Sequence, residues 1–420
     1  MLDRASILDY LNEYKTFMPQ LIERELQVPL DSDLIISLIG PRRAGKTYYF
    51  FQLEKKLKKP LYLNFEDSRL RNIAYNEIRD IIRLYIEEYG ETPKELLLDE
   101  VQNIDGWDIM VRELHDLKKY KIFVTGSSSK MLSKEIATKL RGRTLSYILL
   151  PFSFREFLRA KGIGAEHLTK DKEALIKNAL SEYLEYGGFP DVVMNNEKEK
   201  LLAEYADLIL FRDFIERHEV RNIQLARYIQ QSIMQNFSKE ITSNSLFEKA
   251  RSSGIKVSNN TIYDYLEKLS DTVIFFFIDR YSEKAHERAM WPKKVYLADT
   301  GLSKAFRFAN DIGKLMENVV FLELLRRKND KPLLEVYYLS SSSGEVDFVL
   351  KEGSEVTSLI QVTYELNEDN KERELKPLLS AYSRFKCKEL TVLTWEQEEV
   401  INEEKASIKI TPLWKWLLGI

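Results

Sequence analysis

The stretch LIISLIGPRRAGKTYY, from Leu34 to Tyr49, decides the fold of the first part of the chain. Its apolar beginning predicts a buried strand. From Gly40 to Thr47 it reads G-x-x-x-x-G-K-T, a motif that needs a strand before it and a helix after it. Glycines let backbone N–H groups converge on phosphate oxygens, and the start of a helix adds a partial positive charge. The stretch therefore predicts a site for a nucleoside triphosphate.

The residue types in this loop have separate expected tasks. Lys46 is expected to reach the β- and γ-phosphates, and the Thr47 hydroxyl is expected to hold Mg²⁺. The ligand is therefore expected to be a magnesium-bound triphosphate. The residues expected to contact the nucleotide are Gly40, Pro41, Arg42, Arg43, Ala44, Gly45, Lys46, Thr47 and Tyr48.

Five short apolar runs predict the strands of one sheet. Helical, charged segments separate most of them, as the crossover connections of a parallel sheet require. Residues 27–151 are therefore expected to form an α/β core, and apolar residues at helical spacing predict one helix over residues 1–26 before it. The runs are Leu34–Ile39, Leu61–Phe65, Leu96–Leu98, Ile122–Val124 and Ser146–Leu150.

Two acidic residues, Asp99 and Glu100, end the third run in the sequence ELLLDE. An Asp at a strand end beside the phosphate loop can hold the water shell of Mg²⁺, which makes Asp99 a candidate metal residue. A Glu directly after it can polarise the attacking water as a general base. The pair favours hydrolysis over nucleotide binding alone.

Further candidates follow the fourth run and precede the fifth. Thr125 or Ser127 is expected to orient the water or read the γ-phosphate, with a turn that caps the next helix as the alternative. Arg141 and Arg143 are expected at the rim of the sheet, where one guanidinium would stabilise the γ-phosphoryl group of a neighbouring subunit. The sequence does not separate the two arginines, and a surface salt bridge is the alternative for both.

The second part of the chain begins at residue 152, where the alternation of apolar runs and helical segments ends. Residues 152–230 are predicted to be helical and to form a lid, interrupted at Tyr186–Pro190. Residues 231–298 read as a helix-turn-helix followed by a β-hairpin, the pattern of a winged helix. The exposed face of its third helix would enter the major groove of DNA. That face carries Asp264 and Glu267, so a protein-facing winged helix is the alternative.

Residues 299–420 read as an α/β unit with an incomplete metal site. Glu317 on a helix and Asp347 on a strand are the acids expected of a Mg²⁺-dependent phosphodiester-cleavage site. The next strand would have to supply an acid and a lysine, but it carries Gln361 and Thr363. The loss of one metal ligand and of the lysine predicts that this unit does not cleave DNA.

Composition narrows the classes of protein further. The chain has 420 residues, of which 44% are hydrophobic, as is ordinary for globular domains with large cores. Its formal net charge of −3 provides no global basic field for a nucleic acid, which leaves only a local patch for that role. The single cysteine, Cys387, excludes an internal disulfide framework. No signal-peptide core or membrane-length apolar run is visible, so we expect a cytoplasmic protein with no membrane partner.

Several motifs, taken in order, resemble a known family. GPRRAGKT, ELLLDE, TGSSS, LRGR, LPFSFREFL, EYGGFPDVV, ADTGL and EVDFVL are similar to archaeal and bacterial AAA+-type ATPases that carry a C-terminal domain of unknown function with a restriction-endonuclease-like core. The resemblance implies ATP as the nucleotide, the DE pair as Walker B and one arginine of LRGR as a finger. It also implies an α/β fold with an ASCE-type parallel sheet, a helical lid, a winged helix-turn-helix and a nuclease-like domain.

These observations lead to two expectations about function. The first is an ATP-hydrolysing homo-oligomeric switch or motor that is coupled to DNA through residues 231–298. The second is a nucleotide-gated signalling or scaffold ATPase whose C-terminal domains bind another protein. The near-neutral charge and the acidic residues on the third helix favour the second.

Overall fold

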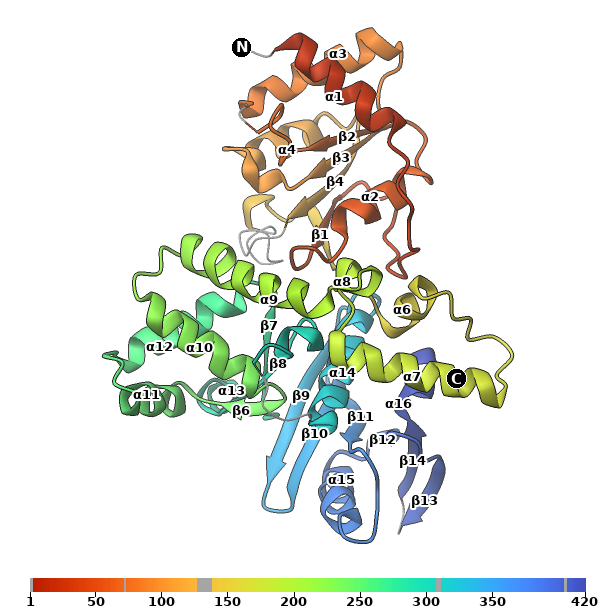
Figure 1. Cartoon of the computed structure of the whole chain (residues 1–420), viewed down its shortest axis with the longest axis vertical. Coiled ribbons are helices and arrows are strands. Elements are labelled where there is room, and N and C mark those ends of the chain that lie inside the picture. Colours follow the sequence, from red (N-terminus) through yellow and green to blue (C-terminus); the bar gives the residue numbers. More distant parts are fainter. Residues whose placement is uncertain (1–2, 72, 127–137, 307–310, 404–405) are drawn as a thin grey trace. The chain divides into compact units, whose positions relative to one another are not determined.

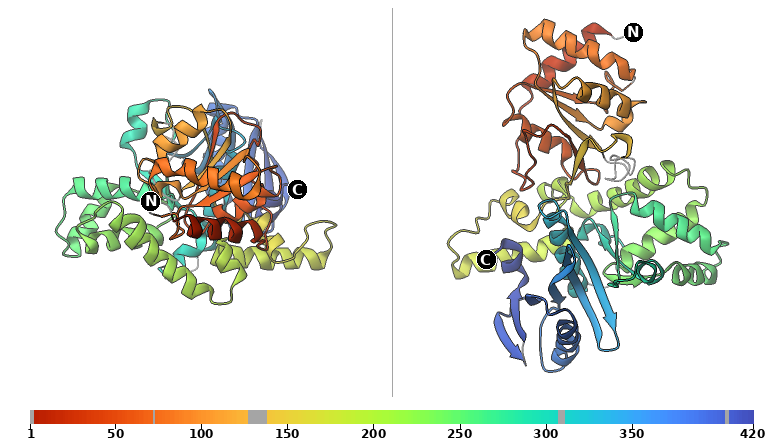
Figure 2. Two further views of the ribbon diagram at one scale, coloured as in Figure 1. Left: turned by 90° about the horizontal axis from the view of Figure 1, so that it is seen from above. Right: turned by 180° about the vertical axis from the view of Figure 1, so that it is seen from behind.

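The computed structural model describes residues 3–71, 73–126, 138–306, 311–403 and 406–420. The chain forms two compact units, an N-terminal unit (Met1–Leu150) and a C-terminal unit (Pro151–Ile420) (Figures 1 and 2). The N-terminal unit contains the phosphate-loop motif, and the C-terminal unit contains the regions predicted as lid, winged helix and nuclease-like domain.

The N-terminal unit is built on a parallel five-stranded sheet with the order β2-β3-β4-β1-β5 (Figure 1). All five predicted strands are confirmed. β1 and β3 are buried along their whole length, as expected for strands of a parallel sheet that is covered on both faces. The bounds are β1 Ile35–Ile39, β2 Pro60–Asn64, β3 Glu95–Asp99, β4 Lys121–Gly126 and β5 Thr144–Ile148.

Helices follow the strands and bury apolar side chains against the sheet. Phe50 of α2 belongs to the same buried cluster as Leu38 of β1 and Phe123 of β4. This packing fixes the helix that directly follows the phosphate loop. The helices of this unit are α1 Arg4–Thr16, α2 Lys46–Glu54, α3 Ile78–Tyr89 and α4 Trp107–Asp116.

The N-terminal helix is shorter than the sequence pattern predicted. α1 ends at Thr16, so the prediction of one helix over residues 1–26 is wrong in its second half. Pro19 explains the difference, because a proline disfavours helical backbone at the residue before it. Residues 17–29 have no regular secondary structure, yet they bury Arg24 and Val28.

The first part of the C-terminal unit is helical, as predicted. Ser153 and Glu156 form a capping box at the start of α6, and each side chain accepts a hydrogen bond from the other's backbone N–H. Gly187 ends α7 with a positive φ of 77°, and Pro190 begins α8. A π-helical segment, Ile209–Glu216, continues α9. The helices are α6 Phe154–Ala160, α7 Lys170–Tyr186, α8 Pro190–Met194, α9 Lys198–Leu208 and α10 Ile223–Gln235.

A small three-stranded antiparallel sheet follows, with the order β6-β8-β7. Two helices, α11 and α12, separate its first strand from its second. The two later strands pair with each other as the predicted hairpin does, but a short helix lies in their connection. The elements are β6 Lys239–Ile241, α11 Ser243–Ser252, α12 Asn259–Ser270, β7 Phe275–Asp279, α13 Ala285–Met290 and β8 Lys293–Leu297.

The chain ends in a mixed six-stranded sheet with the order β13-β14-β12-β11-β10-β9, in which β11, β12 and β14 run parallel (Figure 1). Leu378 of α15 packs into the same buried cluster as Val349 and Leu359 of the sheet. In the part of the chain that the structure describes, we find no helix with the length and apolarity to cross a membrane. The elements are α14 Ile312–Arg327, β9 Leu334–Ser341, β10 Gly344–Glu352, β11 Glu355–Val362, α15 Lys371–Phe385, β12 Glu389–Thr394, β13 Glu399–Glu403, β14 Ala406–Pro412 and α16 Leu413–Leu418.

Candidate nucleotide site

The phosphate loop follows β1 at the carboxyl end of that strand, and α2 begins at its Lys46. Gly45 has a left-handed backbone with φ 92°, which a residue without Cβ adopts at no steric cost. Gly40 is needed for another reason, because a Cβ there would lie 2.0 Å from the carbonyl oxygen of Leu149. The shape of the loop therefore depends on both glycines of the motif.

Lys46 is buried within the loop, with its side chain 4% exposed. Its ammonium donates to the carbonyl oxygens of Gly40 at 3.1 Å and Pro41 at 3.0 Å, and it lies 3.5 Å from a carboxylate oxygen of Glu100. A buried cation needs such partners. The charged oxygens of a triphosphate would be stronger acceptors than the two carbonyls, so the placement fits a phosphate-binding lysine.

Asp99 is fully buried at the end of β3 and is surrounded by hydroxyl groups. The hydroxyls of Thr47 at 2.7 Å and Tyr62 at 2.9 Å donate to one carboxylate oxygen, and Thr125 donates to the other. Burial, and then the neighbouring charge of Glu100, raise the pKa of Asp99, while the three hydroxyl groups lower it. Hydroxyl and carboxylate oxygens side by side are the donor set that Mg²⁺ prefers, so the residues present fit that ion.

Glu100 has a left-handed backbone, with φ 53°, which is uncommon for a residue with a side chain. Its backbone N–H donates to the hydroxyl of Thr125 at 2.9 Å, and that same hydroxyl donates to Asp99. Its carboxylate accepts a hydrogen bond from the side-chain amide of Gln102. Thr125 therefore connects the two acidic residues and supports the strained backbone of the second.

Family comparisons match these regions. Residues 32–158 match a family described as an AAA domain. Residues 177–311 match a domain of unknown function, DUF8612, and residues 312–416 match another, DUF4143. An uncharacterized protein of Methanocaldococcus jannaschii is 37% identical over 428 residues, which cover 98% of this chain and 94% of that protein. The chain belongs to the same family as this archaeal protein.

Other similar proteins span most of the chain as well. An uncharacterized protein of Haemophilus influenzae is 29% identical over 421 residues, covering 96% of this chain and 98% of its own. A solved structure of a Walker-type ATPase of Pyrococcus abyssi is 15% identical, with a TM-score of 0.43, and the match covers 73% of this chain and 96% of that one. The motif, the sheet and the matched domain together make the N-terminal unit an AAA-type P-loop ATPase domain that binds nucleotide.

Arg24 lies in the N-terminal unit, which we call the AAA unit from here on, and no sequence motif indicated it. It is 5% exposed, and its guanidinium donates to the carbonyl oxygens of Ala44 in the phosphate loop, at 2.8 Å, and of Leu150 at 2.6 Å. Its backbone N–H donates to the side chain of Gln52 on α2. The phosphate-loop motif gives no signal for a contact from so far upstream, and Arg24 stands between two other charged residues, Glu23 and Glu25, so nothing in the sequence marks it.

Three further residues predicted to contact the nucleotide, Arg42, Arg43 and Tyr48, are partly or fully exposed. Arg42 forms an ion pair at 3.2 Å with Glu66, which follows β2. Arg43 is exposed and has φ 62°, and Tyr48 is 52% exposed on the first turn of α2. These three side chains therefore border the loop, where their contact with a nucleotide stays a prediction.

The two candidate finger arginines lie at the other end of the sheet. β5 starts directly after Arg143 and opposite Ile35, the first residue of β1, whereas the phosphate loop follows the last residue of β1. Arg143 donates to Asp116 at 3.2 Å, and Arg141 is exposed with φ 51°. Neither is placed to reach its own phosphate loop, so action on a neighbouring subunit stays a prediction. Ser127, the alternative sensor, lies outside the described residues.

The residues predicted for the incomplete metal site are brought together in the C-terminal unit. Glu317 and Asp347 both contact Lys294, a residue that the sequence did not single out. Gln361 accepts a hydrogen bond from the backbone N–H of Asp347 at 3.3 Å. The hydroxyl of Thr363 instead donates to the carbonyl of Glu365, two residues along the chain.

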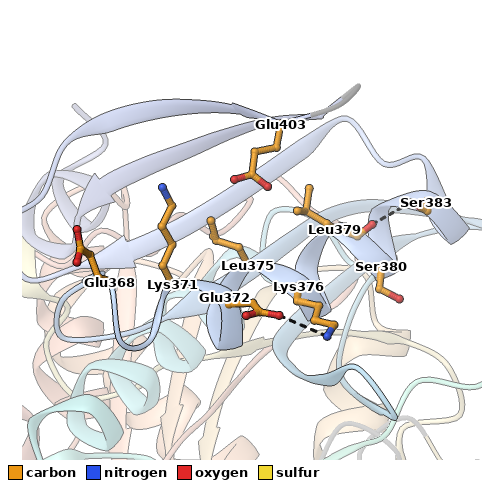
Figure 3. A pocket seen from close by; sticks show the side chains of 9 residues that line it. All are labelled: Glu368, Lys371, Glu372, Leu375, Lys376, Leu379, Ser380, Ser383 and Glu403. Atoms are coloured by element: carbon orange, nitrogen blue, oxygen red, sulfur yellow. Dashed lines mark hydrogen bonds and ion pairs between the residues drawn. The ribbon is translucent and has the colours of Figure 1, made fainter.

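A separate open pocket of about 730 Å³ lies along α15 in the same unit (Figure 3). Its lining mixes charges of both signs, among them Lys371, Glu372 and Lys376, and the last two form an ion pair at 3.5 Å. None of the residues predicted for the nucleotide site or the metal site lines it. The pocket therefore has no part in either predicted site.

Proposed function

We propose that the chain hydrolyses ATP and works as a homo-oligomeric switch or motor coupled to DNA. The observation that supports hydrolysis best is the position of Glu100. Its carboxylate lies 3.5 Å from the ammonium of the phosphate-loop lysine, Lys46, and its backbone N–H donates to the hydroxyl of Thr125. A protein that only held nucleotide would not need an acid supported in this strained position. ATP, rather than another triphosphate, is part of the proposal.

The proposed roles follow from the contacts of each group. Bound Mg²⁺, held through Thr47 and Asp99, would neutralise charge on the phosphates. Lys46 would bind phosphate oxygens and so release Glu100 from their ion pair. Glu100 would then orient the attacking water and accept its proton. Thr125 acts through the two acids and is a positioning residue.

The oligomer is proposed because the two predicted finger arginines lie away from the phosphate loop of their own chain. Arg141 and Arg143 precede β5, at the end of the sheet opposite the phosphate loop. A guanidinium there would be available to the nucleotide of a neighbouring subunit, where it would stabilise charge on the γ-phosphoryl group. Arg143 would have to exchange its present partner, Asp116, for that nucleotide.

DNA coupling is proposed through residues 231–298, which we interpret as a winged helix. The order helix, strand, two helices and two paired strands supports this interpretation. Three cations, Lys249, Arg251 and Lys256, are exposed at the end of α11 and just before α12, where they would contact phosphates. Asp264, whose negative charge would repel DNA phosphates, forms an ion pair with Lys268 at 2.8 Å. This pairing offsets part of the repulsion.

A protein partner is the second candidate for the same surface. Tyr263 on α12 is 64% exposed, and an exposed aromatic residue is as well suited to a protein interface as to a nucleic acid. Glu267 on the same helix is exposed and acidic. Nucleotide hydrolysis that no DNA stimulates would favour this role over the first.

Two substitutions test the hydrolytic proposal. Lys46→Ala should weaken binding of a fluorescent ATP analogue, because the phosphates lose their buried cation. Glu100→Gln should bind the analogue as the parent chain does, while phosphate release falls by roughly a hundredfold or more, the range for loss of a general base. Phosphate release by Glu100→Gln at the parent rate would show that Glu100 is not the base.

A further inference from the structure

Lys294 lies at the centre of an acidic cluster in the C-terminal unit, in which Glu317 and Asp347 are buried and Glu345 is partly exposed. Its side chain is 3% exposed, and its ammonium contacts Glu317 at 2.9 Å, Asp347 at 3.1 Å and Glu345 at 2.5 Å. Lys, Glu and Asp are rarely buried unless they are paired. One cation therefore holds three carboxylates that come from two other elements, α14 and β10.

The local structure of each element explains how these groups meet. Side chains two residues apart lie on the same face of a strand, so β8 presents Lys294 and Tyr296 together, and β10 presents Glu345 and Asp347 together. The hydroxyl of Tyr296 donates to the same oxygen of Glu317 that accepts from the lysine, at 2.7 Å. Three elements are thus joined at one point.

The ammonium has no donor left for a further ligand. A lysine has three N–H donors, and three carboxylate oxygens accept them here. A divalent cation such as Mg²⁺ or Mn²⁺ would need oxygens of the same kind at about 2.0–2.6 Å. Because the ammonium already lies among these oxygens, the two cations would compete for one position.

We propose that the Lys294 ammonium takes the place of a divalent cation in this cluster, so that the C-terminal unit is held by an internal cation and binds no metal there. This goes beyond the loss of the acid and lysine on β11, since it states what replaces the metal. The lysine comes from β8, in the region interpreted as a winged helix, and so ties that region to the six-stranded sheet.

The electrostatics of the cluster agree with an internal cation. Burial alone would lower the pKa of Lys294, but Glu317, Tyr296 and the other acids raise it well above its ordinary value, so the ammonium stays charged. Burial raises the pKa of Glu317 to about 8, although the lysine opposes this shift.

Titration of Mn²⁺ into the full chain without nucleotide, followed by electron paramagnetic resonance of the free ion, tests the proposal. All chains carry Asp99→Asn, which removes the proposed metal residue of the phosphate-loop site. We expect that adding Asp347→Asn leaves Mn²⁺ binding unchanged. We expect Lys294→Met to gain one Mn²⁺ per chain and Lys294→Met with Asp347→Asn to lose it. Lys293→Met, on the exposed side of the same strand, is the matched control and should gain none.

Two results would overturn the proposal. One is Mn²⁺ bound by the chain with Lys294 and lost on Asp347→Asn, because the site would then accept metal beside the lysine. The other is a Lys294→Met chain that is folded by near-ultraviolet circular dichroism and binds no additional Mn²⁺. If Lys294→Met does not fold, the proposal is tested by Mn²⁺ binding to the chain that keeps Lys294, measured with and without Asp347→Asn.

Discussion

Thr125 shows how much of the nucleotide site depends on one hydroxyl group. It accepts a hydrogen bond from the backbone of Glu100 and donates one to Asp99, so it links the proposed base to the proposed metal residue. It is completely buried at the end of β4, where no water can replace it. The side chain thereby supports both acids, and we expect it to act through them.

Replacing this hydroxyl should therefore reduce turnover more than binding. Thr125→Val keeps the shape of the side chain but leaves two buried groups without their partner, which costs about 1–3 kcal/mol and lowers the turnover number about tenfold to a hundredfold. Thr125→Ser keeps the hydroxyl and should stay within about threefold of the parent rate. Steady-state ATPase assays with measured ATP affinities check this. An unchanged turnover number for Thr125→Val would show that the Thr125 hydroxyl does not support catalysis.

At the scale of elements, the irregular segment before β1 contributes to the phosphate loop. Its buried guanidinium, from Arg24, bridges a loop carbonyl and the last residue of the AAA unit. The segment is thus a structural part of the nucleotide site, although it lies outside the residues that match the AAA family. Its irregular path is what brings the arginine to the loop.

Arg24→Ala should weaken ATP binding, because it leaves the carbonyls of Ala44 and Leu150 buried without donors, at about 1–3 kcal/mol each. We expect a raised KM for ATP with a smaller change in kcat, and partial rescue by Arg24→Lys. Thermal melting of each variant separates loss of the fold from loss of the site. An Ala variant with parent KM and parent stability would contradict this role.

A second element-scale junction joins the turn after α7 to the segment after β8. Asp299 is buried there and accepts hydrogen bonds from the N–H groups of Gly188 at 2.6 Å and Gly301 at 2.9 Å. A Cβ at Gly187 would lie 1.7 Å from its carboxylate, so the glycine is required. The YGGFP and ADTG motifs are therefore parts of one structural junction.

Burial raises the pKa of Asp299 to about 7, against an ordinary value of about 3.9. Between about pH 4 and pH 7 the folded chain holds a proton that the unfolded chain releases, so this group lowers stability as pH rises through that window, by up to about 1.4 kcal/mol per pH unit. Asp299→Asn removes that slope, though it also weakens one hydrogen bond at every pH. Melting temperatures from pH 5 to 7.5 should converge between parent and variant as pH rises. A constant difference would contradict the assignment.

The sequence predicted the elements that depend on local patterns, and it missed the contacts that depend on the fold. Apolar runs between charged segments were enough for β1 to β5, and the phosphate-loop motif placed Lys46 and Thr47 correctly at the start of α2. The first helix was predicted too long because its apolar spacing continues past Pro19. Arg24 and Lys294 were not found, since each makes contacts with residues far away in the chain.

At the scale of the whole molecule, the chain joins an AAA unit to a larger C-terminal unit through Leu150 and Pro151. The net charge of −3 gives no long-range attraction to nucleic acid, so any DNA contact has to come from local cations such as Lys249 and Lys256. Phosphate contacts of this kind weaken steeply as salt rises. DNA coupling should therefore be visible at low salt and fade at high salt.

The steady-state ATPase rate, measured at low salt with and without double-stranded, single-stranded and branched DNA, tests the central claim most directly. We expect at least one DNA form to raise the rate and added salt to reduce this stimulation. We expect Glu100→Gln to abolish hydrolysis with and without DNA. No hydrolysis by the parent chain, or hydrolysis that Glu100→Gln retains, would contradict the proposed enzyme. Hydrolysis that every DNA form leaves unchanged would contradict the coupling and point to a protein partner.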